Sequence, residues 1–172
     1  MPCRTLLALA IVVTVPSIFT SAAQAAEPGG YLEALAGQIY YEADSDLDET
    51  VFGLRSGYRF GDRWAIEGAV SFQDVDDVDV YLIDLSMRGS IVSGRRAELF
   101  FVGGPGLFRA DFGGDSSDDT ENEIALHAGL GLAVDLGERV YLRPDVRARW
   151  ISGDLFEDDL HVEATLALGF RF

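Results

Sequence analysis

The chain ends with the stretch His161-Val-Glu-Ala-Thr-Leu-Ala-Leu-Gly-Phe-Arg-Phe172, in which every second residue is apolar. The six residues from Val162 to Phe172 at even positions are all apolar, whereas four of the six at odd positions are polar or charged. Successive side chains of a β-strand point to opposite faces of the sheet. The stretch therefore predicts a strand of about a dozen residues with one apolar and one polar face.

The same period of two recurs along the rest of the chain from Tyr31 onward. The connections between these segments alternate between tight turns, at 61–63, 92–96 and 137–139, and longer loops. Strands of about 9–11 residues that alternate in this way, with short turns on one side, are typical of membrane-spanning barrels. We expect an all-β fold, an eight-stranded antiparallel up-and-down transmembrane β-barrel. Its strands are predicted at 31–41, 51–60, 64–73, 80–91, 97–110, 124–136, 140–151 and 160–172.

The first residues have the features of an export signal. Arg4 precedes an apolar run over 6–15, and Ala23-Gln24-Ala25 is a small-residue cleavage site. We expect residues 1–25 to be a cleaved signal peptide, which removes Cys3, the only cysteine of the chain. Residues 26–172 then form one barrel domain, expected as a monomer in the outer membrane of a Gram-negative bacterium.

Four charged residues, Arg143, Asp145, Arg147 and Arg149, occupy alternate positions of one predicted strand, with apolar residues between them. A membrane barrel would place such charges in its lumen and the apolar face toward lipid. A soluble exported carrier with the apolar face inward is the alternative; it would need a ligand cavity and a lid. The predicted lumen network is Arg55, Arg59, Glu67, Asp84, Arg88, Arg143, Asp145, Arg147, Arg149 and Glu163.

Tight turns also predict which residues of neighbouring strands face each other. If Leu136 lies opposite Val140, then Gly129 faces Arg147 and leaves room for its long side chain. Placing Phe60 opposite Trp64 puts Glu67 opposite Gly57 and diagonal to Arg55 and Arg59, within reach of their long side chains.

Acidic residues dominate the charge of the chain, with 29 Asp and Glu against 13 basic residues and a net charge of −16. This excess argues against a nucleic acid partner, whose phosphates would be repelled. The predicted longer loops, at 42–50, 74–79, 111–123 and 152–159, hold 19 of the acidic residues and no Arg. Within the first loop, Asp44, Asp46 and Asp48 are candidate ligands for a divalent cation, although the spacing departs from an EF-hand loop. Merely solvated loops, or adaptation of the organism to salt, are alternative explanations.

No motif in the chain indicates catalysis or a cofactor. The two histidines, His127 and His161, are predicted to point inward, and neither has a serine two residues away. The inward-pointing hydroxyls of Ser71, Ser86 and Ser90 lie on other predicted strands. We therefore expect no enzyme; the alternative is a lipid A hydrolase or acyltransferase, which needs a nucleophile and a base placed together. A wide pore is also not expected, because side chains fill the lumen of an eight-stranded barrel.

The run Gly57–Phe72, GYRFGDRWAIEGAVSF, resembles the second and third strands of the small OmpA-like outer-membrane β-barrel proteins. The segments FFVGGPGLF (100–108), HAGLGLAVDL (127–136) and the terminal GFRF are similar to that family as well. The resemblance implies that Phe172, with Phe170, is a signal read by the barrel-assembly machinery. We expect a role in membrane integrity or surface contact, with outer-membrane lipid and lipopolysaccharide as partners and with divalent cations as candidate partners of the acidic loops. Two prolines depart from the family pattern: Pro105 and Pro144 each delete a backbone donor, which predicts a bulge or local fraying.

Overall fold

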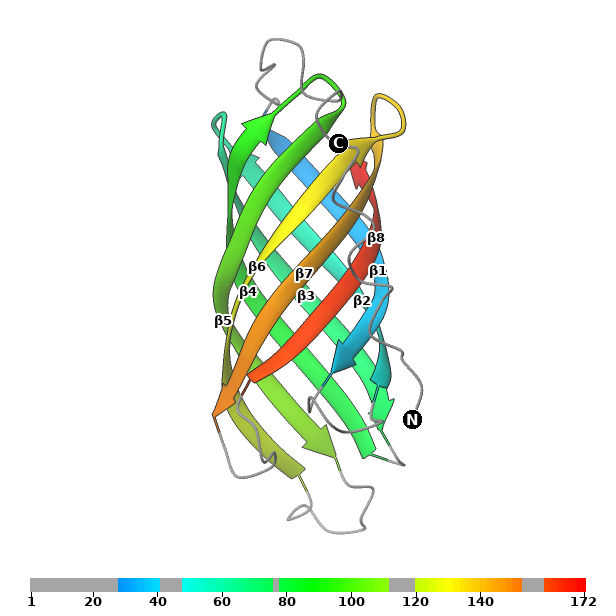
Figure 1. Cartoon of the computed structure of the whole chain (residues 1–172), viewed down its shortest axis with the longest axis vertical. Helices are drawn as coiled ribbons and strands as arrows, with labels where there is room; N and C mark the ends of the chain where they lie inside the picture. Colours follow the sequence, from blue (N-terminus) through cyan, green and yellow to red (C-terminus); the bar gives the residue numbers. More distant parts are fainter. Residues whose placement is uncertain (1–27, 41–47, 76–77, 112–119, 153–159) are drawn as a thin grey trace, which may run out of the picture.

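The computed structural model describes residues 28–40, 48–75, 78–111, 120–152 and 160–172. These residues form a closed antiparallel barrel in which each strand pairs with its neighbours in sequence, and the last strand pairs with the first (Figure 1). The fold class expected from the sequence is confirmed. The strands are β1 (Gly29–Tyr40), β2 (Asp48–Phe60), β3 (Trp64–Val75), β4 (Val78–Ser93), β5 (Ala97–Asp111), β6 (Thr120–Asp135), β7 (Val140–Ser152) and β8 (Leu160–Arg171).

The two ends of the barrel differ in their connections. The short turns at 61–63, 94–96 and 136–139 lie at one end, together with the C-terminus, and we call this the turn end (Figure 1). The opposite end, where β1, β3, β5 and β7 finish, is called the loop end. Among the described residues, no helix is long and apolar enough to cross a membrane.

One predicted loop is wrong. Residues 74–79 were expected to form a long loop, but β3 continues to Val75 and β4 begins at Val78, with Val75 paired to Val78. The two β-branched valines extend the strand pattern, so that only residues 76 and 77 connect the strands. The strands β2 and β6 likewise begin earlier than predicted, at Asp48 and Thr120, because backbone pairing continues beyond the apolar stretch.

Apolar side chains cover the outside of the barrel, and charged side chains fill its inside. Leu54 and Leu126 are 59% and 58% exposed, whereas Arg143 and Arg149 are fully buried. This arrangement is the reverse of that in a water-soluble protein, and it suits a barrel whose outer surface contacts the hydrocarbon region of a lipid bilayer. It rejects the alternative of a soluble carrier with an apolar interior.

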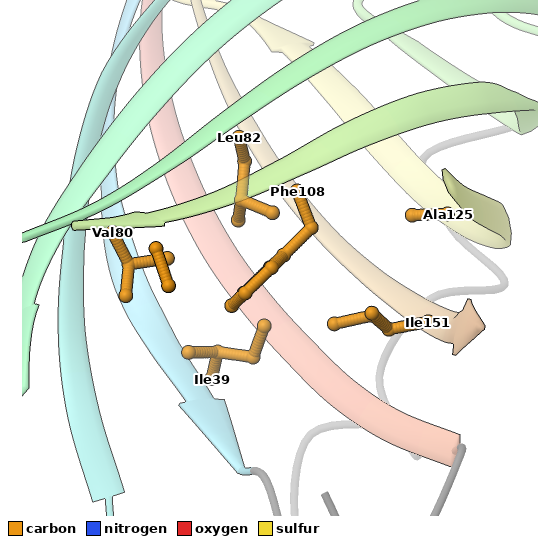
Figure 2. Close-up of a cluster of buried hydrophobic side chains, with 7 residues drawn as sticks. Ile39, Val80, Leu82, Phe108, Ala125 and Ile151 are labelled. Atoms are coloured by element: carbon orange, nitrogen blue, oxygen red, sulfur yellow. The ribbon is translucent and has the colours of Figure 1, made fainter. Parts of the chain in front are cut away.

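Two apolar clusters close the lumen, one toward each end. The loop-end cluster brings side chains from five strands together, as Figure 2 shows: Ile39, Val80, Leu82, Phe108, Ala110, Ala125 and Ile151. The turn-end cluster consists of Tyr31, Ala65, Phe100, Val102, Ala133 and Tyr141. Most of the buried charges lie between these two clusters, whereas Glu98, with Arg59 and Arg88, lines an open cavity at the turn end.

Glycines make room for the long side chains of the lumen. As the turn register predicts, Gly129 lies opposite Arg147 and Gly131 opposite Asp145. A Cβ atom added at Gly131 would come within 2.3 Å of the Phe100 ring. Real Cβ atoms do not approach so closely, so a larger residue there would force the ring to move.

Each proline interrupts the pairing on one side of its strand and leaves the register unchanged. The β4–β5 ladder lacks the pairs beside Pro105 and resumes in the same register at Met87 and Gly103. The β6–β7 ladder has a similar gap beside Pro144. The other sides, toward β6 and β8, pair through both prolines without a break. The predicted disturbance is thus local, because a proline lacks only its own N–H donor.

Replacing Gly131 by Val should lower the free energy of unfolding by about 1–3 kcal/mol, because the new side chain overpacks the lumen. Urea unfolding in phospholipid vesicles, followed by tryptophan fluorescence, measures this change. The control is Gly137→Ala on the exposed β6–β7 turn, where an added Cβ would meet no atom within 4 Å. Equal stability of the two variants would contradict the packed lumen.

Candidate functional site

The lumen holds a continuous network of charged side chains, most of which lie between the two apolar clusters. All ten residues that the sequence places in the lumen are buried, and Arg59, at 7%, is the most exposed of them. The strand β7 contributes four of these residues at successive inward positions, so that they form a row along the barrel axis: Arg143, Asp145, Arg147 and Arg149. This row connects the charged groups near one end with those near the other.

Arg143 is the centre of the half nearer the turn end. Its Nη1 and Nη2 donate to Oε1 and Oε2 of Glu67 at 2.8 and 3.0 Å, and Nη1 lies 3.1 Å from Oε1 of Glu33. Arg55 Nη1 donates to Glu33 Oε2 at 2.8 Å and to Asp145 Oδ2 at 3.1 Å. Charge-assisted hydrogen bonds of this kind are the strong ones in a low-dielectric interior.

Arg149 plays the same part nearer the loop end. It donates from both terminal nitrogens to the two oxygens of Asp84, at 2.7 and 2.8 Å, and from Nη2 to Glu163 at 2.7 Å. Arg147 Nε donates to Asp145 Oδ1 at 2.9 Å, and its Nη1 lies 3.7 Å from Asp84 Oδ2, so that Arg147 joins the two halves of the network.

A third cluster surrounds Glu98, close to the turn end. Its carboxylate accepts hydrogen bonds from Arg59 Nη2 at 2.5 Å, from Arg88 Nη2 at 2.9 Å and from the Ser90 hydroxyl. Arg88 also lies 3.6 Å from Glu67, so this cluster is continuous with the rest of the network.

Aromatic residues add hydrogen-bond donors to two carboxylates and cover two of the guanidinium groups. The hydroxyl of Tyr31 donates to Glu67 at 2.6 Å, and that of Tyr141 donates to Glu33 at 2.6 Å. The Phe100 ring lies 4.0 and 4.4 Å from the guanidinium carbons of Arg88 and Arg143, a cation–π arrangement.

The buried charges balance. Among the described residues, the buried acids are Glu33, Glu67, Asp84, Glu98, Asp145 and Glu163, and the buried arginines are Arg55, Arg59, Arg88, Arg143, Arg147 and Arg149. Six carboxylates against six guanidinium groups give a lumen of zero net charge when both histidines are neutral. Pairing of this kind is what makes buried charges tolerable.

Sequence reasoning missed Glu33 and Glu98, and it did not find the partner of Glu67. The predicted set contained six arginines but four acids, and this imbalance was a signal that two acids were missing. Glu33 also lies on the same face of β1 as Tyr31 and Leu35, which are both buried, and this position indicates that its side chain points into the lumen. Glu67 bonds to Arg143 across the lumen rather than to Arg55 or Arg59 on the adjacent strand. Arg55 reaches Glu33 and Asp145 instead.

The lumen also holds a serine, a histidine and an aspartate in contact. Ser86 Oγ and His127 Nε2 lie 2.8 Å apart, and His127 Nδ1 lies 3.5 Å from Asp84 Oδ1. Ser86 and His127 belong to β4 and β6, and Gly104 of β5, which pairs with His127, has no side chain to separate them. Both oxygens of Asp84 are bonded to Arg149, and all three residues are at most 5% exposed, which leaves no space for a substrate.

The other predicted site residues lie outside this network. Asp44 and Asp46 fall outside the described residues, and Asp48 is the first residue of β2. Within the part of the chain that the structure describes, no group of three His, Cys, Asp or Glu residues is placed to hold a metal ion. Phe170 and Phe172 point outward, at 44% and 75% exposure.

The chain is similar to known outer-membrane barrels. The outer membrane protein beta-barrel domain matches residues 5–172. The crystal structure of Neisserial surface protein A has 20% sequence identity and a TM-score of 0.69, with 84% of this chain and 97% of that chain covered. The N-terminal barrel domain of Pseudomonas aeruginosa OprF has 17% sequence identity and a TM-score of 0.60, with 85% of this chain and 100% of that chain covered. Ail, the attachment invasion locus protein of Yersinia pestis, has 16% sequence identity and a TM-score of 0.58, with 85% of this chain and 100% of that chain covered. No curated protein matches the chain in sequence.

Replacing Arg143 by Met should destabilise the barrel by about 3–5 kcal/mol, because Glu67 and Glu33 lose a buried partner. The change is measured by urea unfolding in lipid vesicles. The double variant Arg143→Met with Glu67→Gln should recover part of the loss, since one orphaned charge is removed.

The matched control is Arg171→Gln, which breaks the ion pair with Asp135 in which both side chains are 32% exposed. An exposed pair of this kind is worth less than about 1 kcal/mol. A loss for Arg143→Met no larger than that of the control would show that the lumen network does not stabilise the barrel.

Proposed function

Since this chain belongs to the family of outer-membrane β-barrel proteins, we propose that it is a closed barrel whose function lies at the cell surface, where its acidic loops contact ligands. The filled lumen is the observation that carries this proposal. Paired charges occupy it, and an apolar cluster crosses it toward each end. A hydrated solute would have to break several ion pairs to pass, so the barrel serves as a rigid support rather than as a wide pore.

The chemistry of the loop end favours cations. The segments that join the strands there, at 41–47, 76–77, 112–119 and 153–159, contain many Asp and Glu residues and no basic residue. Longer loops of outer-membrane barrels face the exterior of the cell. Lipopolysaccharide phosphates would be repelled by these carboxylates unless divalent cations bridge the two. We assign to the loops a collective, weak divalent-cation site that holds neighbouring lipopolysaccharide, with Asp44, Asp46 and Asp48 among the ligands.

One related structure makes this proposal specific. Ail from Yersinia pestis, with 17% identity and a TM-score of 0.60, has been solved in complex with the heparin analogue sucrose octasulfate. The present chain has no basic residue in its loops with which to bind such a polyanion directly. Attachment to a polyanion should therefore depend on divalent cations, which distinguishes this barrel from one with basic loops.

The same proposal includes how the barrel reaches its place. Residues 1–25 direct export and are removed, and Phe172 with Phe170 is read by the barrel-assembly machinery. The outward position of both rings supports this role, because the rings are free to contact another protein before insertion. The mature barrel acts as a monomer.

Binding of the purified barrel in nonionic detergent to immobilised lipopolysaccharide should require millimolar Ca²⁺ and disappear with EDTA. Surface plasmon resonance measures it. Replacing Asp44, Asp46 and Asp48 by Asn should weaken the binding about fivefold, because cation affinity follows the number of charged ligands. Asp62→Asn, on the β2–β3 turn at the other end, is the control and should change nothing. Binding that persists in EDTA would refute the cation bridge.

The Ser86–His127 contact raises a second candidate, a lipid A hydrolase or acyltransferase. We expect no such activity, since a nucleophile must reach its substrate and Ser86 is 4% exposed. A fluorophosphonate probe should not label the native barrel, and Ser86→Ala should leave the mass spectrum of lipid A unchanged when the gene is expressed. Labelling that is lost in Ser86→Ala would establish the enzymatic function instead.

A further inference from the structure

A cavity of about 690 Å³ opens at the turn end, and Arg59, Arg88 and Glu98 of the lumen network form part of its lining. Its inner wall includes Tyr31, Ala133 and Tyr141 of the turn-end cluster. Its rim is formed by residues of the β4–β5 and β6–β7 turns and by the end of β8. A volume of this size lies within the range of about 300–1,000 Å³ that small-molecule sites occupy.

The charge of this turn-end cavity is opposite to that of the whole chain. Five arginines and three acidic residues line it, a side-chain balance of +2, while the chain carries −16. Two of the arginines, Arg59 and Arg88, are held by Glu98, and Arg171 is held by Asp135 at 2.6 Å. These three stay in place and form the fixed part of the wall.

The remaining two arginines, Arg95 and Arg139, are available to a ligand. Both are exposed, and neither makes an ion pair or a side-chain hydrogen bond with another residue in the described part of the chain. They come from two different turns, β4–β5 and β6–β7, that border the same cavity. Two free guanidinium groups at one rim suit a ligand that carries two or more negative groups, since arginine binds carboxylate and phosphate with paired hydrogen bonds.

The acidic loops do not cancel this local positive charge. The strands are 12 to 16 residues long and rise about 3.3 Å per residue, so that even tilted strands separate the two ends by tens of ångströms. The Debye length at physiological ionic strength is about 8 Å, which screens charges at that distance. An anion at the turn end therefore experiences the nearby arginines rather than the distant carboxylates.

We propose that the turn-end cavity binds a small oligoanion of the periplasm, with two or more phosphate or carboxylate groups, through Arg95 and Arg139. Tyr31 and Tyr141 form the inner wall and limit how deeply a ligand can enter the cavity. Arg171, whose guanidinium lies over the Tyr141 ring at 4.2 Å, adds a third positive group to the lining. The site is independent of the loop-end function, because it lies at the opposite end of the barrel.

The test is isothermal titration calorimetry of the mature full chain in zwitterionic detergent at low ionic strength, with pyrophosphate and citrate as probes. At least one of them should bind with a stoichiometry of one. Arg95→Gln and Arg139→Gln should each weaken binding about threefold and the double variant about tenfold, as expected for exposed ionic contacts. The tighter probe identifies the group that the cavity prefers, phosphate or carboxylate.

Arg96→Gln is the matched control, because Arg96 is the exposed neighbour of Arg95 on the same turn but does not line the cavity. It should bind the probe as tightly as the unmodified barrel does. An unchanged electrophoretic mobility of the unboiled variants in SDS verifies that all of them are folded. The proposal is overturned if neither probe binds, or if Arg96→Gln weakens binding as much as Arg95→Gln does, since the latter result would mean a general surface charge effect.

Discussion

The hydrogen-bonded ladder between β1 and β8 is the contact on which the rest of the structure depends. It pairs residues from Tyr31 with Arg171 to Tyr40 with Val162, and it leaves no strand with an open edge. In hydrocarbon an unpaired backbone group costs several kcal/mol, so a sheet can cross the membrane only when it is closed. Closure with eight strands also determines the width of the lumen, which is narrow enough for side chains to fill.

A narrow, closed lumen imposes a strict condition on its charges. Each ionised group buried inside must have a partner, because an uncompensated charge in a low-dielectric interior is costly. The chain meets this condition with equal numbers of buried acids and arginines, and with tyrosine hydroxyls that donate to Glu67 and Glu33. The same pairing explains why a contact between Ser86 and His127 does not by itself indicate an active site. The aspartate beside them is bonded to Arg149.

Because the interior is filled, recognition of other molecules is left to the two ends, and the ends differ in charge. The loop end carries connections rich in Asp and Glu, whereas arginines outnumber acids around the turn-end cavity. Screening over the length of the strands keeps these two regions electrostatically separate. Under the two proposals made above, one barrel presents a cation-binding surface toward the exterior and an anion-binding cavity toward the periplasm.

The sequence by itself determined the strands, the face that each side chain takes, and the register across tight turns. These features depend on alternation and on turn length, which are local, so the pairs Gly57–Glu67 and Gly129–Arg147 could be predicted. Only the tertiary structure decided which charges meet across the lumen, such as Glu67 with Arg143 and Asp84 with Arg149. Those contacts depend on the tilt and stagger of all eight strands in the closed barrel. No single segment of the sequence contains that information.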